Sequence, residues 1–297
     1  MKRLFLFLLT NLAAVAMLTI AATVVCAFCG VNLEEALGDG GYGPLFIYSL
    51  VFGMAGSLIS LLLSKTMVKA SMKCRTIDGT EGEAERWLVE TVRDLSSRAG
   101  VKMPEVAIYP GAANAFATGA FKNSALVAVS TDIMGQMTRE ELRAVLGHEI
   151  SHVANGDMVT LTLIQGVLNA FVIFFSRVLA SILSNAGRGE GSRRGNSGMY
   201  FLLVMVLDIC LGILASLVVF AFSRRREYAA DAGSARLLGT PSSMIAALRR
   251  LGNLQPGVLP DSLKAFGIAE GKKTSLWSTH PSLDDRIAAL QNLTTTL

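Results

Sequence analysis

The feature that most constrains the fold is a pair of long uncharged segments near the start of the chain. Residues 4–28 form 25 consecutive positions without a charge, and residues 44–64 form another 21. A helix needs about 20 apolar residues to cross the hydrocarbon core of a bilayer. The first segment is too long for the apolar region of a signal peptide and has no good cleavage site after it. Residues 1–64 are therefore predicted to form two transmembrane helices.

The composition agrees with a membrane protein and excludes other classes. Hydrophobic residues make up 52% of the chain and charged residues 17%, which excludes a disordered chain. The net charge of +4 is too small to predict a nucleic-acid partner. The four cysteines are too scattered for a disulfide framework. Cys26 and Cys29 have C-x-x-C spacing, but without a second pair they are predicted to be buried thiols.

The charges around the two spans predict their orientation. The connection between them carries Glu34, Glu35 and Asp39 and no basic residue. Basic residues precede the first span and follow the second: Lys2, Arg3, Lys65, Lys69, Lys73 and Arg75. Cytoplasmic segments are enriched in Lys and Arg. Both flanks are therefore predicted to be cytoplasmic, with the acidic connection on the other side of the bilayer.

Two further apolar runs, residues 158–184 and 199–222, occupy the middle of the chain, and each is long enough to span a bilayer. Each contains one ionisable residue, Arg177 in the first and Asp208 in the second. Because an isolated charge in lipid is costly, the two side chains are predicted to lie near each other or near water. The alternative is that Arg177 reaches the interface from a helix end.

The segment between these runs, residues 185–198, is rich in Gly and Ser and is typical of a flexible linker. It carries Arg188, Arg193 and Arg194 against Glu190, and this positive charge argues against export. Two topologies follow. Either both runs span the bilayer against the charge rule, or both helices are embedded from the cytoplasmic side.

What remains, residues 65–157 and 223–297, has the length of one compact domain split by the apolar insertion. Local patterns predict a helix over 83–99 and strands over 105–109 and 124–129. Between the strands, the small and polar residues 114–119 are predicted to form an edge. A capping box at Thr138 opens a helix that stops at Gly156, and later helices begin at Pro241 and Ser282. The predicted fold class is an integral membrane α-helical protein with a cytoplasmic α+β domain.

The helix predicted from Thr138 contains the sequence His148-Glu149-Ile150-Ser151-His152. Two imidazoles four residues apart lie on one helical face and can bind one metal ion. The intervening glutamate is displaced around the helix and can reach a metal-bound water. This H-E-x-x-H pattern predicts a zincin-like metallopeptidase site that holds one Zn²⁺ per chain, with Glu149 as the general base.

A catalytic zinc usually has three protein ligands, so a third must come from elsewhere in the chain. The candidates are His280 and a distant carboxylate. The best carboxylates are Glu227 and Asp231, which lie four residues apart and face the same way on a helix. One of them could bind the metal while the other hydrogen-bonds a ligand.

With these motifs the chain resembles the integral-membrane zinc metallopeptidases related to the CAAX prenyl proteases. The resemblance rests on His148-Glu149-x-x-His152, the following Asn155-Gly156-Asp157 and the later Arg224-x-x-Glu227-x-x-x-Asp231. The chain length, the two leading spans, Asn114-Ala115-Phe116-Ala117 and Ser278-Thr279-His280-Pro281 resemble a bacterial heat-shock branch of that group.

The resemblance implies a role for each of these residues. Glu227 would be the third zinc ligand, Asp231 its supporting partner, and His280 a group that stabilises the transition state. The segment formed by Asn114, Ala115, Phe116 and Ala117 would lie along a cleft where peptide docks as an added strand. If Glu227 shares a metal with the two histidines, the chain between residues 157 and 223 must cross the bilayer an even number of times.

The implied protein is a zinc endopeptidase of the bacterial inner membrane, with its active site facing the cytoplasm. Its expected partners are the lipid bilayer and membrane-protein or unfolded polypeptide substrates, in membrane-protein quality control. Two alternatives stay open at this stage. One is a processing peptidase for lipid-modified protein tails. The other is a zinc-stabilised membrane module without catalysis, which the presence of Glu149 disfavours because a structural zinc site needs no general base.

Overall fold

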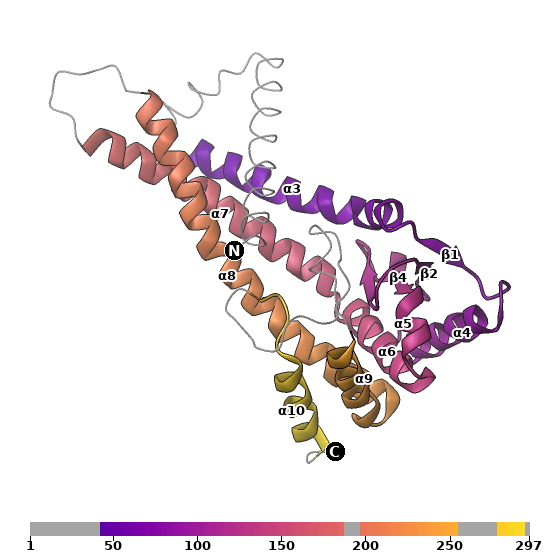
Figure 1. Cartoon of the computed structure of the whole chain (residues 1–297). Coiled ribbons are helices and arrows are strands. Elements are labelled where there is room, and N and C mark those ends of the chain that lie inside the picture. The colour runs from indigo at the N-terminus through magenta and orange to yellow at the C-terminus, as the bar shows by residue number, and fades with distance from the viewer. Residues whose placement is uncertain (1–41, 187–196, 255–277, 295–297) are drawn as a thin grey trace. The chain divides into compact units, whose positions relative to one another are not determined.

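The computed structural model describes residues 42–186, 197–254 and 278–294 (Figure 1). The chain divides into two compact units, which are treated separately below. The helical unit comprises Met1–Ile59 and Thr162–Val219, and the α/β unit comprises Ser60–Leu161 and Phe220–Leu297. The predicted span at residues 4–28 and most of the predicted linker at 185–198 lie outside the described residues.

Three described helices are long and apolar enough to cross a membrane. They are α3 (Tyr42–Ser71), α7 (Asp157–Ala186) and α8 (Ser197–Leu238), and they contain the predicted runs 44–64, 158–184 and 199–222. The helical unit exposes many large apolar side chains: Phe46, Ile47, Leu163, Phe171, Ile182, Phe201, Leu202 and Leu214 are among those at least 43% exposed. A surface of this kind is unfavourable in water and suits contact with lipid.

Small residues allow α3 and α7 to approach closely in the helical unit. A Cβ atom added at Gly53 would lie 2.6 Å from the Cα atom of Ala170, so only glycine fits there. One turn further along α3, Ser57 Oγ accepts a hydrogen bond from Asn169 Nδ2 at 3.4 Å. Small residues at such a contact let the backbones of two membrane helices approach closely.

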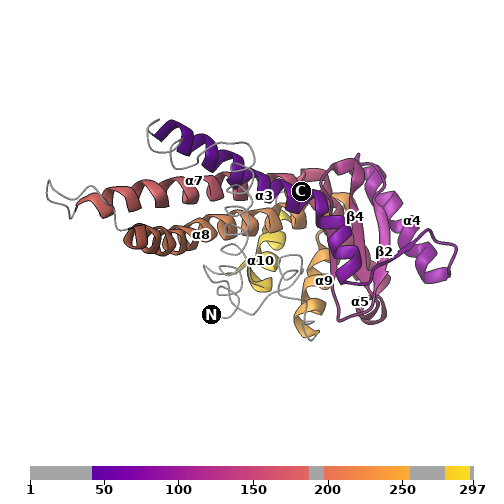
Figure 2. The ribbon, with the colours of Figure 1, turned by 90° about the horizontal axis from the view of Figure 1, so that it is seen from above.

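The two ionisable residues in the apolar runs lie near each other. Arg177 Nη1 is 3.6 Å from Asp208 Oδ1, and both side chains are largely buried. The same guanidinium donates hydrogen bonds to the carbonyl oxygen of Ile173 and to Ser176 Oγ. The pairing predicted for Arg177 and Asp208 is therefore present, and it joins α7 to α8, which are neighbours in Figure 2.

The α/β unit is built on a sheet with the strand order β1-β2-β4-β3. Its strands are β1 (Arg75–Ile77), β2 (Glu105–Tyr109), β3 (Ala115–Thr118) and β4 (Leu126–Ser130). The central strands β2 and β4 are parallel, and each outer strand pairs antiparallel with its neighbour. The predicted edge is thus an edge strand, β3. Strand β1 was not predicted, because three residues are too few to show an alternating pattern.

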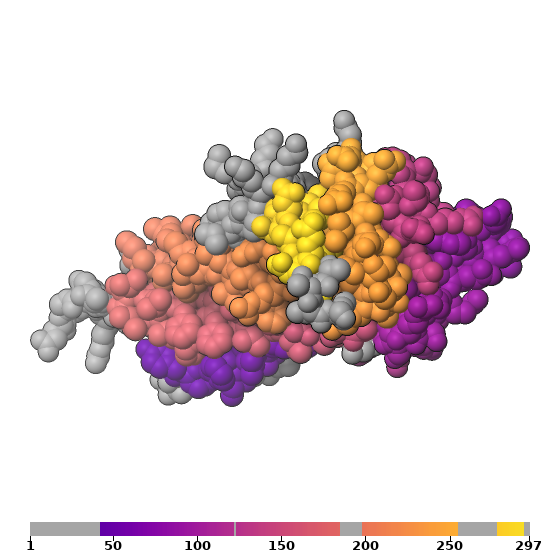
Figure 3. Space-filling view, turned by 90° about the horizontal axis from the view of Figure 1, so that it is seen from below, coloured from indigo at the N-terminus to yellow at the C-terminus, as the bar shows by residue number. Residues whose placement is uncertain are grey.

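Helices cover both faces of this sheet. Val68 and Met72 in the last turns of α3 pack on Ala107, Phe116 and Ala128 on one face. The opposite face packs against α4 (Glu83–Arg98) and α6 (Arg139–Asn155). The remaining helices are α5 (Thr131–Gln136), α9 (Ser242–Asn253) and α10 (Leu283–Thr294), with a short 3-10 turn η1 (Lys122–Ser124). Helices α9 and α10 are in contact and appear side by side in Figure 3.

Candidate metal centre

Helix α6 begins and ends at the residues that its sequence predicts. The Thr138 hydroxyl accepts a hydrogen bond from the Glu141 N–H, and the Glu141 carboxylate accepts one from the Thr138 N–H, which completes the capping box. At the other end Gly156 has a φ of 70°, a left-handed conformation that favours glycine and stops the helix. The helix between these points holds both motif histidines in its buried C-terminal half.

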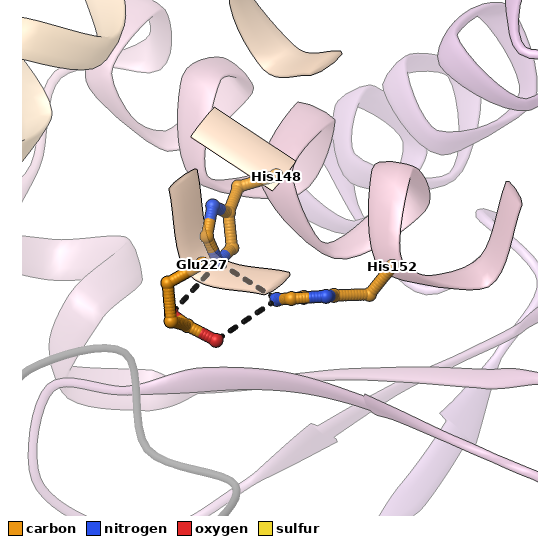
Figure 4. Close-up of side chains that lie close together, drawn as sticks. All are labelled: His148, His152 and Glu227. Carbon is orange, nitrogen blue, oxygen red and sulfur yellow. Dashed lines mark hydrogen bonds and ion pairs between the residues drawn. The ribbon is translucent and has the colours of Figure 1, made fainter. Parts of the chain in front are cut away.

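Three buried side chains from two helices meet in the α/β unit (Figure 4). His148 and His152 extend from α6, and Glu227 extends from α8. The His148 Nε2 atom lies 3.5 Å from one carboxylate oxygen of Glu227, and the His152 Nε2 atom lies 3.3 Å from the other. The two Nε2 atoms are 3.1 Å apart. All three ligand atoms lie within 4.8 Å of one another, so this group could hold a metal ion.

These separations suit zinc. Zinc bonds of about 2.0–2.1 Å in tetrahedral geometry place neighbouring ligand atoms about 3.3 Å apart, close to the three observed distances. In addition, Glu227 Oε2 is buried and accepts no well-aligned hydrogen bond in the described part of the chain, although nitrogens of His280 and Arg286 lie 3.0 and 3.6 Å from it. A cation at this point would satisfy that oxygen, since a buried acceptor without a partner is costly. The donor set of two imidazoles and one carboxylate is also typical of catalytic zinc sites.

Two aspartates orient the histidine rings. His148 Nδ1 lies 2.9 Å from Asp231 Oδ1, and His152 Nδ1 lies 2.5 Å from Asp157 Oδ2. When each Nδ1–H donates to its aspartate, each Nε2 keeps a free lone pair that points toward the third ligand. Asp231 thus occupies the position implied for a supporting partner of the site. Asp157, the first residue of α7, contacts His152 in the same way as Asp231 contacts His148.

Arg286 of α10 fixes Asp231 from behind. Its guanidinium is fully buried and donates two hydrogen bonds to the Asp231 carboxylate, at 2.8 and 2.6 Å. A third nitrogen, Nη1, lies 3.6 Å from Glu227 Oε2. A chain of contacts therefore runs from Arg286 through Asp231 to His148. Nothing in the local sequence distinguishes Arg286, because its partners lie 55 or more residues away.

The carboxylates of the site raise the pKa of the basic groups beside them. Burial lowers the pKa of His152, but the carboxylates of Asp157 and Glu227 outweigh it and raise that pKa to about 10. Burial likewise opposes the charged form of Arg286, yet the ion pair with Asp231 holds its pKa above the usual range. The buried carboxylates of the site therefore favour positively charged groups beside them.

Glu149 follows the first ligand on α6 and is also buried. Burial raises the pKa of its carboxyl group, and the backbone of Ala117 in β3 hydrogen-bonds to it. A backbone N–H that reaches Glu149 points away from the paired strand β4. The side of β3 that faces away from β4 therefore faces the candidate site.

The remaining predicted site residues lie around this group. His280 is buried, with Nδ1 at 3.0 Å from Glu227 Oε2. It is therefore beside the third ligand. The segment implied for substrate docking, Asn114, Ala115, Phe116 and Ala117, coincides with β3 and the residue before it, and all four side chains are buried. The backbone on the side of β3 away from β4 is suited to contact a peptide as an added strand.

A crossing of small residues places Glu227 beside the histidines. A Cβ atom added at Gly233 of α8 would lie 2.5 Å from Ser151 Oγ and 2.7 Å from Ser151 Cβ on α6. Reciprocally, a Cβ at Gly147 of α6 would lie 2.8 Å from Ser234 Oγ on α8. Ser234 Oγ also donates a hydrogen bond to the carbonyl oxygen of Ala144 at 2.7 Å. The two helices can meet this closely only because glycine and serine face each other twice.

Gly233→Ala is accordingly expected to weaken metal binding. The added methyl group must push α8 away from α6 and carry Glu227 with it, at a cost of about 1–3 kcal/mol in unfolding free energy. Zinc affinity and thermal unfolding measure the two effects. Gly135→Ala, where no atom lies within 4 Å of the added Cβ, is the matched control. Ser151→Gly in the Gly233→Ala background should restore affinity, and failure to do so would contradict the crossing as the cause.

Comparisons with known proteins identify the family. The model of peptidase family M48 matches residues 83–294. A protein named Protease HtpX homolog from Verminephrobacter eiseniae is 55% identical over 295 residues, which cover 98% of this chain and 99% of that protein. Another of that name from Paracidovorax citrulli is 52% identical over 293 residues, with 98% and 99% covered. The resemblance to membrane metallopeptidases is confirmed, and its bacterial branch is that of HtpX.

A solved structure shares the fold. The crystal structure of S. mikatae Ste24p superposes with a TM-score of 0.61 at 18% identity. The match covers 95% of this chain but 65% of that one, so about a third of that protein has no counterpart here. Together with the three long apolar helices and the M48 match, the HtpX relatives show that this chain is a membrane metalloprotease that belongs to peptidase family M48.

Proposed function

We propose that the chain is a zinc-dependent endopeptidase that cleaves cytoplasmic segments of damaged or misfolded membrane proteins. The observation that carries the proposal is the buried convergence of His148, His152 and Glu227 with Glu149 beside them. Those three ligands would hold one Zn²⁺. Bound there, zinc supplies a Lewis acid that polarises a carbonyl group and lowers the pKa of water from about 15.7 toward 7.

The chain's own residues supply the proton transfers and the orientation. Glu149 accepts a proton from the attacking water and delivers it to the leaving amine. His280, beside Glu227, donates to the oxygen that becomes negative in the transition state, and Asn114 is a second candidate donor. Loss of one such donor typically lowers the rate by about 10² to 10³. The backbone edge of β3 from Ala115 to Ala117 aligns the substrate as an added strand.

The proposed location is the bacterial inner membrane with the site on the cytoplasmic side. The basic residues that follow the apolar segments support this orientation. Because His148 and Glu227 share one site, both ends of the α7 and α8 segment lie on the same side of the bilayer. A substrate that reaches this site from the cytoplasm is either unfolded or a loop of another membrane protein.

Inverted and right-side-out membrane vesicles test the proposal together. Casein added to inverted vesicles should be cleaved. This cleavage should stop when a zinc chelator is added and return when Zn²⁺ is restored. Right-side-out vesicles should leave casein intact, and cleavage there would overturn the orientation. Cleavage confined to lipid-modified peptides would favour the tail-processing alternative. Zinc binding with no cleavage of either substrate would favour a non-catalytic module.

Glu227→Ala should remove the metal from the protein. The change leaves two imidazoles, which are too few for tight zinc binding at a site built for three ligands. Metal analysis of the purified protein should fall from one zinc per chain to well below one. Glu90→Ala, on the exposed face of α4, is the control. Retention of one zinc per chain after the Glu227 change would show that another residue is the third ligand.

A further inference from the structure

Large hydrophobic side chains are exposed at few places in the α/β unit. Among its described residues they are Leu62, Leu63, Met67, Phe121 and Phe222. Four of them lie on α3 and α8, which are candidate membrane spans. Phe121, at 63% exposure, lies instead in the connection between β3 and β4. Among the described residues of this unit, Phe121 is thus the large exposed apolar side chain that lies outside the long helices.

The contacts of α3 with the sheet show the direction in which the helix runs along it. Lys65 and Lys69 both form ion pairs with Glu105, the first residue of β2, at 2.7 and 2.8 Å. After α3 ends, β1 starts at the opposite end of β2, with Arg75 beside Ile108. The last turns of α3 therefore run away from the Glu105 end. The exposed Leu62 and Leu63, which precede Lys65 within the same unit, therefore lie toward that end of the sheet.

The connection that carries Phe121, residues 119–125, lies at the same end. Thr118, the last residue of β3, pairs with Leu126, and Leu126 pairs with Glu105. Gly119 turns the chain with a φ of 135°, and a Cβ atom there would lie 2.7 Å from the Ser124 carbonyl oxygen. The two ends of the connection thus lie close together, and Phe121 is exposed between them.

The charges at this level are those of a membrane interface. Lys65 and Lys69 follow the apolar part of α3 in sequence and pair with Glu105 at this end of the sheet. Basic residues at the ends of spans lie among lipid head groups, and an exposed phenylalanine can insert at the boundary between head groups and acyl chains. Phe121 therefore has the chemistry, and the position along the sheet, of an interfacial anchor.

We propose that the connection 119–125 docks on the bilayer, with Phe121 inserted between the head groups and the acyl chains at the Glu105 end of the sheet. The edge of β3 that faces away from β4 would then begin at the lipid surface and lead toward Glu149. A polypeptide leaving the bilayer would meet this edge at once. The docking does not depend on the proposed peptidase activity.

Lipid is favoured over a bound polypeptide as the partner of Phe121. Phe121 lies three residues beyond the last residue of β3, at the end from which α3 leaves, whereas Ala117 marks the part of β3 that faces Glu149. A peptide that lies along β3 at the site would be centred away from Phe121. Contact between Phe121 and a bound peptide can be distinguished from contact with lipid, and it is one outcome of the experiment.

Depth-dependent quenching in vesicles tests the docking. In the full-length chain Trp87 and Trp277 are replaced by Phe, and Phe121→Trp adds one reporter. The protein is reconstituted in phosphatidylethanolamine and phosphatidylglycerol vesicles with lipids brominated near the head group. The control is Asp132→Trp, an exposed residue of α5 just past the opposite end of β4, about 15 Å away along the sheet. Asn123→Trp serves as a second reporter in the connection should Phe121→Trp fold poorly.

We expect the tryptophan at position 121 to be quenched at least about threefold more than that at 132, with emission shifted to shorter wavelength, as for side chains at the lipid interface. Equal quenching at positions 121 and 132 would overturn the proposal. So would a reporter at 121 that ignores brominated lipid but changes when casein is added, because that result assigns the connection to peptide binding. Equal zinc content in the variants verifies that they are folded.

Discussion

Replacing Glu149 by glutamine should abolish peptide hydrolysis while the protein keeps its zinc. Glutamine has nearly the same shape as glutamate but cannot accept a proton from water at neutral pH. Loss of general acid–base catalysis lowers rates by about 10² to 10⁴. The three metal ligands are unchanged, so metal analysis should still give one zinc per chain. Casein cleavage and zinc content, measured on the same preparation, separate the two effects.

Glu140→Gln is the matched control, because it makes the same chemical change on an exposed position of the same helix, α6. It should leave turnover unchanged. If Glu149→Gln were to cleave casein at the original rate, Glu149 would not be the base. If it were to lose zinc as well as activity, its role would be structural.

Arg286→Met should have the largest effect on stability. The change leaves the buried carboxylates of Asp231 and Glu227 without the guanidinium that contacts both. Removing one member of a buried ion pair costs about 3–5 kcal/mol in unfolding free energy. Because Asp231 orients His148, zinc affinity should also fall about 10- to 100-fold, as is typical when a partner of a metal ligand is lost. Urea unfolding and competitive zinc titration measure the two losses.

Two further variants separate charge from position. Arg249→Met, on the exposed side of α9, should change neither quantity. The double variant Arg286→Met with Asp231→Leu removes both charges of the pair and should recover much of the unfolding free energy, since apolar replacement of a buried pair is often neutral. Its zinc affinity should stay low, because His148 then has no oriented partner. Full affinity in either Arg286 variant would contradict the role assigned to this contact.

The parts of the fold that are specified locally could be predicted from sequence. Helix α6 has its capping box, its terminal Gly156 and its metal pattern within one short stretch, and the structure agrees at each point. The apolar runs are equally local, because span length alone identifies them. The pairing of Arg177 with Asp208 was predictable from the cost of a lone charge in lipid. Each of these signals requires no knowledge of tertiary contacts.

The rest of the site depends on contacts between distant segments. Arg286 and Asp157 have no local pattern that marks them, and their function appears only once they face Asp231 and His152. The glycine and serine crossing of α6 and α8 also gives no local signal, since small residues are common in helices. Glu227 was one of several candidates from its spacing alone, and the family resemblance selected it. Long-range geometry, which spacing does not encode, decided these points.

Helix α8 continues without a break from its apolar part through Glu227 to Leu238, over 42 residues. One residue inserted between Phe222 and Glu227 would rotate the carboxylate by about 100° and advance it by about 1.5 Å along the axis. Because the contact of Gly233 with Ser151 holds Glu227 beside the histidines, the apolar part of α8 would have to take up that rotation. The apolar residues of α8 and the third ligand are therefore kept in register by one uninterrupted helix, and an insertion or deletion between them would change which side chains the apolar part exposes.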